Sequence, residues 1–462
     1  MRFVSTKTGG ASVSFKTAVL RCLPEEGGLF VPESPPDLRQ FILHMDEETG
    51  FSEMLSSLIP VLFEGELDPA AAARIAASAA GFKPELIRLG PVDSVRDETG
   101  GSGRGPGASG EKPGSAIDRI SVLNLYNGPT GTFLDFAITF LAALLEELLS
   151  ARFARTMVVS AVRGTGISVA RAFLGRRGIT AALLYPENFP TLGIDPKDCI
   201  NRGGNLIPIQ VEGTADDCQD LVAALINDRP FAERHNITSA NAINPGRLLS
   251  QVFYFLYSFI QLKRSLSGEL VFSLPTGNLG SLITGLYAWK FGMPVNGFIA
   301  AMNSNNAAGG FIRGQGFSRQ SLVITNSPRL DITRPSNLER LETFYREAPV
   351  VMRNMVFPES IDDQMTLQTI KKVRERHGLF LDPQSAVAFA AAEKIAAGRD
   401  FYGDIVVFAT EHPARYAETI YKATGERIAV PDRLKAMEQK TEPVARIKNS
   451  LESVESAIAG CF

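Results

Sequence analysis

One pattern recurs along this chain: a short apolar run, a turn of small residues, and then a stretch with helical periodicity. The runs at residues 157–160, 270–274 and 405–409 each lead into such a turn and such a stretch. Further short apolar runs lie at residues 181–185, 206–211 and 297–301. Strands that alternate with helices predict βαβ units, in which helices cover both faces of a parallel sheet. The expected fold class is therefore α/β.

The length of the chain predicts more than one domain. At 462 residues it is too long for one compact core, and two or three domains of roughly 150 residues each are expected. Residues 98–115 read ETGGSGRGPGASGEKPGS and contain no large apolar side chain. Such a segment buries too little apolar surface to offset the entropy of ordering it. We therefore expect a surface insertion here, between an N-terminal unit and the rest of the chain.

Charge and cysteine content exclude several classes of protein. The 47 Lys and Arg nearly balance the 50 Asp and Glu, and the net charge of −3 argues against a nucleic-acid partner. The most apolar helical stretch, residues 136–149, contains Glu146 and Glu147 and falls short of the ~20 apolar residues that a membrane span needs. The 4 cysteines and 4 histidines lack metal-ligand spacing. We therefore expect no metal site, and a reducing cytoplasm is the expected location.

The turn T-G-N-L-G at residues 276–280 is the best candidate for an anion site. It lies between an expected strand and a helix, whose N-terminus exposes N–H groups and carries partial positive charge. The alternative is a plain strand-to-helix turn. The turn R-G-T-G at residues 163–166 has the same setting with an added cation. His412 follows a third strand and is either a general base or a hydrogen-bonded structural group at a helix start.

These and other strings resemble the threonine synthase family, pyridoxal-phosphate enzymes with a fold of the tryptophan-synthase-β-like type. The string G-T-A-D-D-C-Q at residues 213–219 is similar to the family's G-x-x-D-D-C-Q, which is too particular to arise from fold constraints alone. The other matches follow in the family's order along nearly the whole chain. They are S-F at 14–15 with G-G-L-F-V-P at 27–32, G-P-T at 128–130 with F-x-D-F at 133–136, N-x-x-R at 244–247, T-G-N-L-G at 276–280, P-S-N-L-E-R at 335–340, D-P at 382–383 with A-V at 386–387, and T-x-H-P-A at 410–414.

The resemblance implies an α/β protein of pyridoxal-phosphate (PLP) fold type II, with a two-domain body and an N-terminal domain. The expected division is an N-terminal domain over residues 1–92, a flexible Gly/Ser/Pro-rich insertion over 93–118, a large domain over 119–156 and 236–462, and a small domain over 157–235. The ligand cleft is expected between the two domains of the body.

The resemblance also implies a reaction. Family members convert O-phospho-L-homoserine and water to L-threonine and phosphate, with pyridoxal phosphate held by a lysine as a Schiff base. Thr410 is expected at the pyridine nitrogen, and Asn244, Arg247 and Thr165 at the substrate phosphate, where a guanidinium donates two parallel hydrogen bonds. A small phosphorylated ligand and a monomer or homodimer follow from the same resemblance. The residues expected at the cofactor phosphate are Gly277, Asn278, Leu279, Gly280 and Ser281.

The chain departs from the family at the catalytic position. In the family pattern G-P-T-x-x-F-K-D-F the lysine carries the cofactor, and here that position is Leu134. Leucine has no amine, and loss of one positioned acid–base group costs about 10²- to 10⁴-fold in rate. We expect Arg163 and Glu411, which bear opposite charges, to pair across the cleft. The altered positions expected around the site are Asn127, Arg163, Gly164, Ala242 and Glu411.

Two functions from different classes are left open by these residues. One is a slow threonine synthase that binds pyridoxal phosphate non-covalently and uses another base. Lys290 is a poor substitute for the missing lysine because it lies near the far end of the helix that follows the cradle. The other is a pseudoenzyme with a ligand-binding, regulatory or partner-binding role on the same scaffold.

Overall fold

The computed structural model describes residues 1–462 except 8, 90–118, 151–155, 163–165, 188, 190–191, 267, 319, 399–402, 436, 438–440 and 462. The expected insertion at residues 93–118 therefore lies outside the described residues. The division of the chain into domains stays a prediction, and the sheets are described below one at a time.

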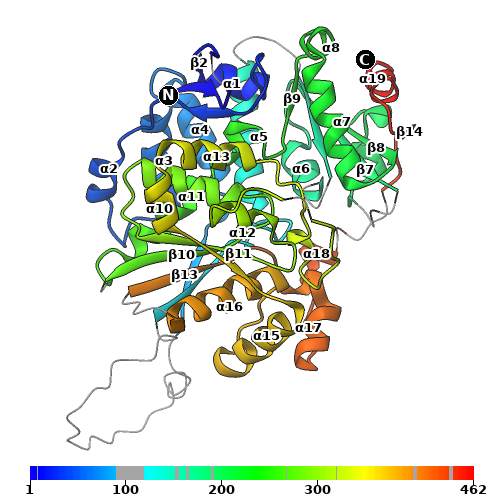
Figure 1. Ribbon diagram of the computed structural model, residues 1–462. Helices are drawn as coiled ribbons and strands as arrows, with labels where there is room; N and C mark the ends of the chain where they lie inside the picture. Colours follow the sequence, from blue (N-terminus) through cyan, green and yellow to red (C-terminus); the bar gives the residue numbers. More distant parts are fainter. Residues whose placement is uncertain are drawn as a thin grey trace, which may run out of the picture.

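The largest sheet lies in the middle of the molecule and has six strands in the order β12–β11–β10–β13–β5–β4 (Figure 1). Neighbouring strands are parallel except β4, which pairs antiparallel with β5. The central strands are mostly buried apolar runs, as a parallel sheet between two layers of helices requires. The expected α/β class is confirmed. The strands are β4 (Glu85–Arg88), β5 (Ile120–Asn124), β10 (Glu269–Pro275), β11 (Gly297–Met302), β12 (Val356–Ser360) and β13 (Gly403–Ala409).

Helices cover both faces of this sheet (Figure 1). Because successive side chains of a strand point to opposite faces, Phe272 and Phe408 lie in one core while Val271 and Val407 lie in another. The first core contains α5 (Leu134–Ser150), α10 (Val252–Leu262) and α11 (Gly280–Lys290). The second contains α15 (Asp363–His377), α16 (Pro383–Gly398) and α17 (Ala417–Thr424).

The second sheet has five parallel strands in the order β14–β8–β7–β6–β9. Its strands β6, β7 and β8 lie between residues 156 and 212, and β9 and β14 come from later in the chain. Helix α19 packs against α7, whose first turn is closed by a capping box between Thr214 and Asp217. The elements are β6 (Thr156–Ala161), α6 (Gly166–Phe173), β7 (Ile179–Pro186), β8 (Leu206–Glu212), α7 (Ala215–Asn227), α8 (Arg229–Arg234), β9 (Ile237–Ser239), β14 (Ala445–Lys448) and α19 (Leu451–Ala459).

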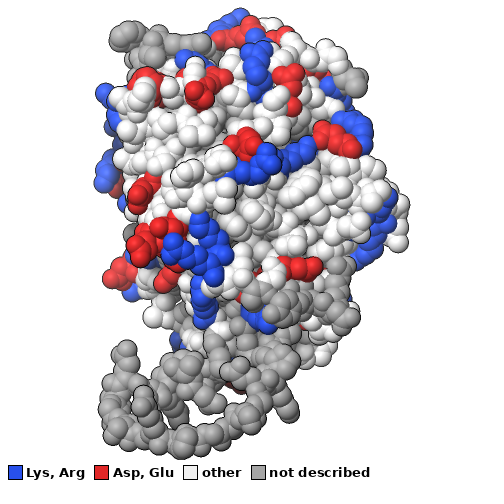
Figure 2. All heavy atoms as spheres, turned by 90° about the vertical axis from the view of Figure 1, so that its left-hand side faces the viewer, with Lys and Arg blue, Asp and Glu red and all other residues white. Residues whose placement is uncertain are grey.

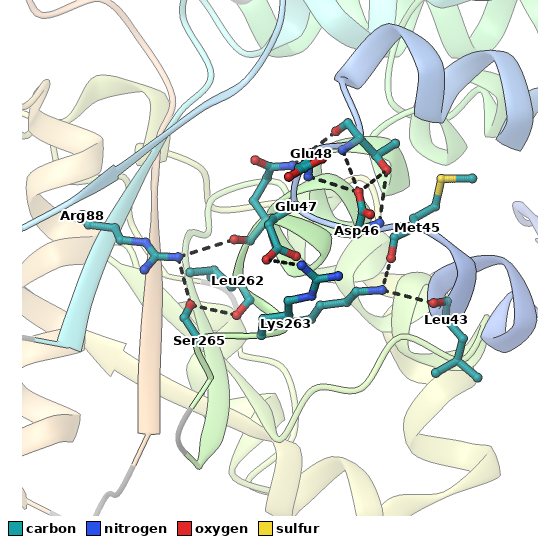
Figure 3. A network of polar contacts seen from close by, with 12 residues as sticks. Leu43, Met45, Asp46, Glu47, Glu48, Arg88, Leu262, Lys263 and Ser265 are labelled. Atoms are coloured by element: carbon teal, nitrogen blue, oxygen red, sulfur yellow. Dashed lines mark hydrogen bonds and ion pairs between the residues drawn. The ribbon is translucent and has the colours of Figure 1, made fainter.

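The N-terminal segment forms a three-stranded antiparallel sheet and four helices. Polar contacts fasten it to the body at the end of α10 (Figure 3). Lys263 Nζ donates to the carbonyl oxygens of Ile42 at 3.1 Å and Leu43 at 3.3 Å, which lie in the last turn of α2. These bonds satisfy carbonyls that a helix end leaves without partners. The elements are β1 (Arg2–Ser5), β2 (Val13–Ser14), α1 (Phe15–Arg21), β3 (Phe30–Pro32), α2 (Arg39–His44), α3 (Phe51–Leu62) and α4 (Pro69–Ala79).

The remaining elements are short connectors or lie around the rim of the large sheet. They are α9 (Pro245–Leu249), α12 (Ala307–Ile312), α13 (Leu338–Glu347), α14 (Pro349–Met355), α18 (Asp432–Lys435) and the 3₁₀ helices η3 (Pro196–Asp198), η4 (Ile200–Arg202), η5 (Pro328–Leu330) and η6 (Pro413–Tyr416).

The described surface carries charges of both signs. On the face shown in Figure 2, basic side chains lie beside acidic ones and wide uncharged areas separate the groups. Among the residues that the structure describes, no helix combines the length and the apolar character needed to cross a bilayer.

Candidate functional site

The turn between β10 and α11 forms a cradle of backbone N–H groups. Those of residues 277–281 donate to no acceptor within the described part of the chain. Leu279, the N-cap residue, has φ +63°, a left-handed conformation that turns the chain into the helix. The 11-residue helix α11 adds the partial positive charge of its N-terminus. The arrangement suits an anion with several acceptor oxygens, such as a phosphate group.

Two contacts fix this cradle in place. A Cβ atom on Gly277 would lie 3.0 Å from the carbonyl oxygen of Arg329, so glycine allows the two segments to approach closely. The Asn278 amide donates to Ser336 Oγ at 2.8 Å and accepts from the Ser336 N–H. Asn278 therefore uses its side chain to hold the neighbouring loop, and only its backbone N–H is left for a ligand.

Two further loops meet beside the cradle, one after β5 and one after β13. The Phe133 N–H donates to the Thr410 carbonyl at 2.8 Å, and the His412 N–H donates to the Gly131 carbonyl at 2.8 Å. Thr132 and Glu411 form an isolated antiparallel bridge between these bonds. The first residue of α5, Leu134, is thereby placed next to Thr410.

These loops enclose a cavity of about 150 Å³. Leu134 lies in its wall, with 7% of its surface exposed. None of the described residues that line the cavity is a lysine, and Lys290 pairs with Glu347 elsewhere. Of the residues expected at the site, those in the wall are Leu134, Ala242, Arg247, Gly277, Asn278, Leu279, Gly280, Ser281, Thr410 and Glu411.

Arg247 supplies a cation to this cavity. The residue is 5% exposed, and its guanidinium donates to the Ala240 carbonyl at 2.7 Å. Its Nε is buried and has no partner, and no carboxylate among the described residues pairs with Arg247. Burial lowers the pKa of Arg247 to about 10. A buried cation in this state is stabilised by an anion that enters the cavity.

Asn244 lies outside the cavity wall, although it was expected beside Arg247 at a ligand phosphate. Its fully buried amide donates to the Val19 carbonyl at 3.0 Å and the Ser239 carbonyl at 2.9 Å. Its Oδ1 accepts from the Gly246 N–H at 2.9 Å, which caps α9. The Asn244 side chain is therefore committed to the chain's own backbone and places Arg247, which follows one turn later.

Glu411, another residue of the cavity wall, forms a buried ion pair. Its Oε1 lies 2.9 Å from an Arg329 nitrogen, and Tyr416 donates its hydroxyl hydrogen to the other carboxylate oxygen. Burial alone would raise the pKa of Glu411, but Arg329 and Arg415 together with the hydroxyl hold it below its ordinary value. Arg163, the expected partner of Glu411, lies outside the described residues, and Arg329 pairs with this carboxylate.

A second carboxyl group, Asp382, lies behind Glu411. It accepts from the Glu411 N–H at 3.2 Å and from the Ser385 N–H and hydroxyl. Burial, with a further contribution from the nearby Glu411 charge, raises the pKa of Asp382 to about 7. Asp382 is therefore a support for the loop that carries Glu411, and its carboxyl gains a proton near neutral pH.

The sequence and the fold of this chain are similar to those of known threonine synthases. The family model described as "Threonine synthase N terminus" matches residues 2–79, and "Threonine synthase, C-terminal" matches residues 385–458. A curated threonine synthase from Serratia marcescens is 29% identical over 94% of this chain and 93% of its own length. The crystal structure of threonine synthase from Escherichia coli superposes with a TM-score of 0.83 and 26% identity, covering 100% of both chains. The chain belongs to the threonine synthase family.

The pyridoxal-phosphate fold type II expected from the resemblance is likewise confirmed. A structure described as PLP-bound threonine synthase from Brucella melitensis matches with a TM-score of 0.81 and 25% identity, over 100% of this chain and 99% of that one. Pyridoxal phosphate is therefore the cofactor expected from the relatives.

The other positions at which this threonine synthase relative was expected to differ are only partly described. Ala242 lines the cavity, and its carbonyl accepts from the buried Arg340 at 2.9 Å. Asn127 lies outside the cavity wall and bonds with Asn124 and the Lys83 carbonyl. Gly164 and Thr165 fall outside the described residues, so the expected place of Thr165 at a ligand phosphate stays a prediction.

Several lining residues were not singled out by the sequence. Arg329 and Gln251 lie in no string that matches the threonine synthase family. Gln219 ends the G-x-x-D-D-C-Q string and Gln384 follows the D-P pair, so the matching strings carried a signal for these two. Their role depends on which loops meet, and no local pattern shows that.

His412 was expected to be either a general base or a structural group at a helix start, and its contacts are those of the structural group. Its Nδ1 accepts from the Ala414 N–H at 3.2 Å at the start of η6, and its ring lies edge-on to Tyr126. Burial, with the nearby Arg433 and Arg415, lowers the pKa of His412 to about 4. In the described part of the chain, no group of three His, Cys, Asp or Glu residues could hold a metal ion.

Proposed function

We propose that this threonine synthase relative binds a small phosphorylated ligand in the cavity but has lost, or performs poorly, the family reaction. That reaction converts O-phospho-L-homoserine and water to L-threonine and phosphate. The observation that carries the proposal is the place of Leu134: it lies in the cavity wall beside Thr410, and no described residue of that wall offers an amine.

The residues present fit one end of pyridoxal phosphate and not the other. The N–H groups of residues 277–281 suit its phosphate, and Thr410 lines the cavity where a hydroxyl is expected at the ring nitrogen. When bound, the cofactor supplies an electron sink for carbanion chemistry. Covalent attachment at Leu134 is impossible, so any binding of this cofactor is non-covalent.

The chain's own residues support binding better than turnover. Arg247 and the cradle supply the charge and the donors that orient a phosphate. Leu134, Leu330 and Ile332 give the same cavity an apolar wall that excludes water. A reaction at this site also needs a group that accepts and returns a proton, and Leu134 provides none. His412 is held at a helix start, and Asp382 lies outside the cavity wall.

Of the two forms of this proposal, the geometry favours a non-catalytic binding protein over a slow enzyme. The Arg329–Glu411 pair lines the same cavity as Leu134 and Thr410 and would have to rearrange if catalysis required that space. Opening a desolvated ion pair leaves two buried charges uncompensated.

The proposal is tested by titrating the protein with inorganic phosphate and with pyridoxal phosphate in a calorimeter, together with an assay of phosphate release from O-phospho-L-homoserine. We expect binding of both anions, no absorbance band of lysine-bound cofactor, and no release above the uncatalysed rate. The Arg247→Ala variant should lose about tenfold or more in phosphate affinity, while Arg353→Ala, an exposed arginine elsewhere, should not. Turnover of about 1 to 10³ per second by the unaltered chain, or no binding of either anion, would overturn the proposal.

A further inference from the structure

We propose that Glu411 sets the ligand preference of the cavity. The cavity selects a small phosphate ester that carries an amine at the end away from the phosphate. It rejects an ester that also carries a carboxylate at that end. This inference rests on the proposed function, because it takes phosphate binding at the cradle and Arg247 as given. It adds what the cavity recognises at the end of the ligand away from the phosphate.

The two arginines of the described cavity wall, Arg247 and Arg329, are in different states. Arg247 has no carboxylate partner, while Arg329 is engaged by Glu411 through two guanidinium nitrogens, at 2.9 and 3.1 Å. Glu411 is 2% exposed and Arg329 is largely buried, so water screens the pair little. The cation that could have received a carboxylate at this end is therefore already neutralised.

The cavity wall beside Glu411 also offers an acceptor. Gln384 lines the cavity and is 1% exposed, and its amide nitrogen donates to the Tyr416 hydroxyl at 2.7 Å. Its Oε1 is buried and has no partner among the described residues. A buried acceptor left unpaired costs free energy, which a donor on the ligand recovers. This oxygen favours an N–H donor on the ligand, and an ammonium group supplies one.

A ligand carboxylate at this end meets the opposite conditions. It would approach a buried Glu411 carboxylate and an unpaired amide oxygen, and it could gain Arg329 only by displacing Glu411. Because the Arg329–Glu411 pair is neutral as a whole, a carboxylate placed beside it would lose its hydration without gaining a cation. A desolvated group left without a partner excludes a ligand as effectively as a new attractive contact selects one.

The test uses three phosphate esters that differ only at this end. O-phospho-L-homoserine carries an amine and a carboxylate, 3-aminopropyl phosphate carries the amine alone, and propyl phosphate carries neither. In calorimetric titrations of the unaltered chain, we expect 3-aminopropyl phosphate to bind at least about tenfold more tightly than either of the others.

Two variants locate this preference. Glu411→Gln keeps the size of the side chain and removes its charge, and it should bring the affinity ratio of 3-aminopropyl phosphate to O-phospho-L-homoserine down to about one, since Arg329 is then released. Gln384→Leu removes the unpaired acceptor and keeps the Glu411 carboxylate and its pair with Arg329, and it should reduce the advantage of 3-aminopropyl phosphate over propyl phosphate by about tenfold. The second variant keeps the test decisive if the first fails to fold, which a calorimetric Tm shows.

The outcomes separate this inference from the proposal beneath it. If all three esters bind with equal affinity, or if O-phospho-L-homoserine binds most tightly, the selectivity assigned to Glu411 is wrong while phosphate binding stands. If neither the esters nor inorganic phosphate bind, both this inference and the proposed function are wrong. A preference that Glu411→Gln and Gln384→Leu leave unchanged would also contradict the inference.

Discussion

The Phe133 N–H donates to the carbonyl oxygen of Thr410 at 2.8 Å, which ties the first turn of α5 to the loop after β13. This bond involves backbone atoms only, so it persists whichever side chain stands at position 134. The residue at position 134 and Thr410 therefore line one cavity in any variant that folds. Under the proposed function, the change at position 134 removes one functional group and leaves this backbone bond in place.

Leu134→Lys is expected to restore attachment of the cofactor but not ordinary activity. With added pyridoxal phosphate, the variant should show the absorbance of lysine-bound cofactor, because the cradle and Thr410 remain in the cavity wall. Phosphate release from O-phospho-L-homoserine should stay well below the ordinary enzyme range of about 1 to 10³ per second, because Glu411 and Arg329 still occupy the neighbouring wall. Leu134→Met, of similar size but without an amine, is the control and should show no such band. Full activity of the lysine variant would show that the other altered residues of the site do not prevent the family reaction.

Arg247→Met is expected to raise stability and lower phosphate affinity together. The change removes a buried cation that has no carboxylate partner and fills its place with an apolar side chain of similar length. Thermal unfolding should show an unchanged or higher Tm, and calorimetry should show phosphate affinity reduced by about tenfold or more. A lower Tm with unaltered phosphate affinity would make Arg247 a structural residue.

Asp382 should make the free energy of unfolding depend on pH. Its folded-state pKa is raised to about 7, above the ordinary value of 3.8, so the folded state binds a proton that the unfolded state has released. Its contribution to stability is therefore present at low pH and is lost as pH rises towards about 7, with a slope of at most about 1.4 kcal/mol per pH unit. Denaturant titrations at several pH values should show that Asp382→Asn gains stability relative to the unaltered chain between about pH 4 and 7. A difference that stays constant over this range would contradict the raised pKa.

Two glycines of the cradle should respond differently to alanine. The added Cβ at Gly277 would lie 3.0 Å from the Arg329 carbonyl and 3.2 Å from Leu330 Cα, both backbone atoms that cannot easily move. At Gly280 the nearest atom is Leu248 Cδ2 at 3.6 Å, an ordinary van der Waals contact. We expect Gly277→Ala to lower both Tm and phosphate affinity, and Gly280→Ala to keep the Tm. Equal effects on the Tm would show that the approach of Arg329 to the cradle is not tight.

The sequence predicted the backbone features of the site better than its side-chain partners. The cradle at residues 276–280 follows from a strand, two glycines and a helix, which are adjacent in the chain and act through the backbone. The Arg329–Glu411 pair joins loops that are far apart in the sequence, so no local pattern indicates it. Arg163 was expected as the partner because its charge is opposite and both loops were expected to face one cleft.

Asn244 illustrates the reverse case. Its residue type and spacing to Arg247 match the family string, which predicted a ligand contact. The buried carbonyls of Val19 and Ser239 take up its amide instead. Whether a polar side chain faces a ligand or the chain's own backbone depends on the burial of its neighbours, and burial is a property of the assembled fold.

The strand pairing has a consequence for how the protein is made. The ribosome makes β5 and β8 well before it makes their parallel partners β13 and β14. Parallel pairings over such sequence distances are slow, and incomplete chains expose unpaired strands to association with other molecules. The ligand cavity, whose walls come from residues 133 to 411, is therefore completed late during translation. A nascent chain arrested before β13 would have no complete phosphate site. Its unpaired strands would depend on chaperones to prevent their association with other molecules.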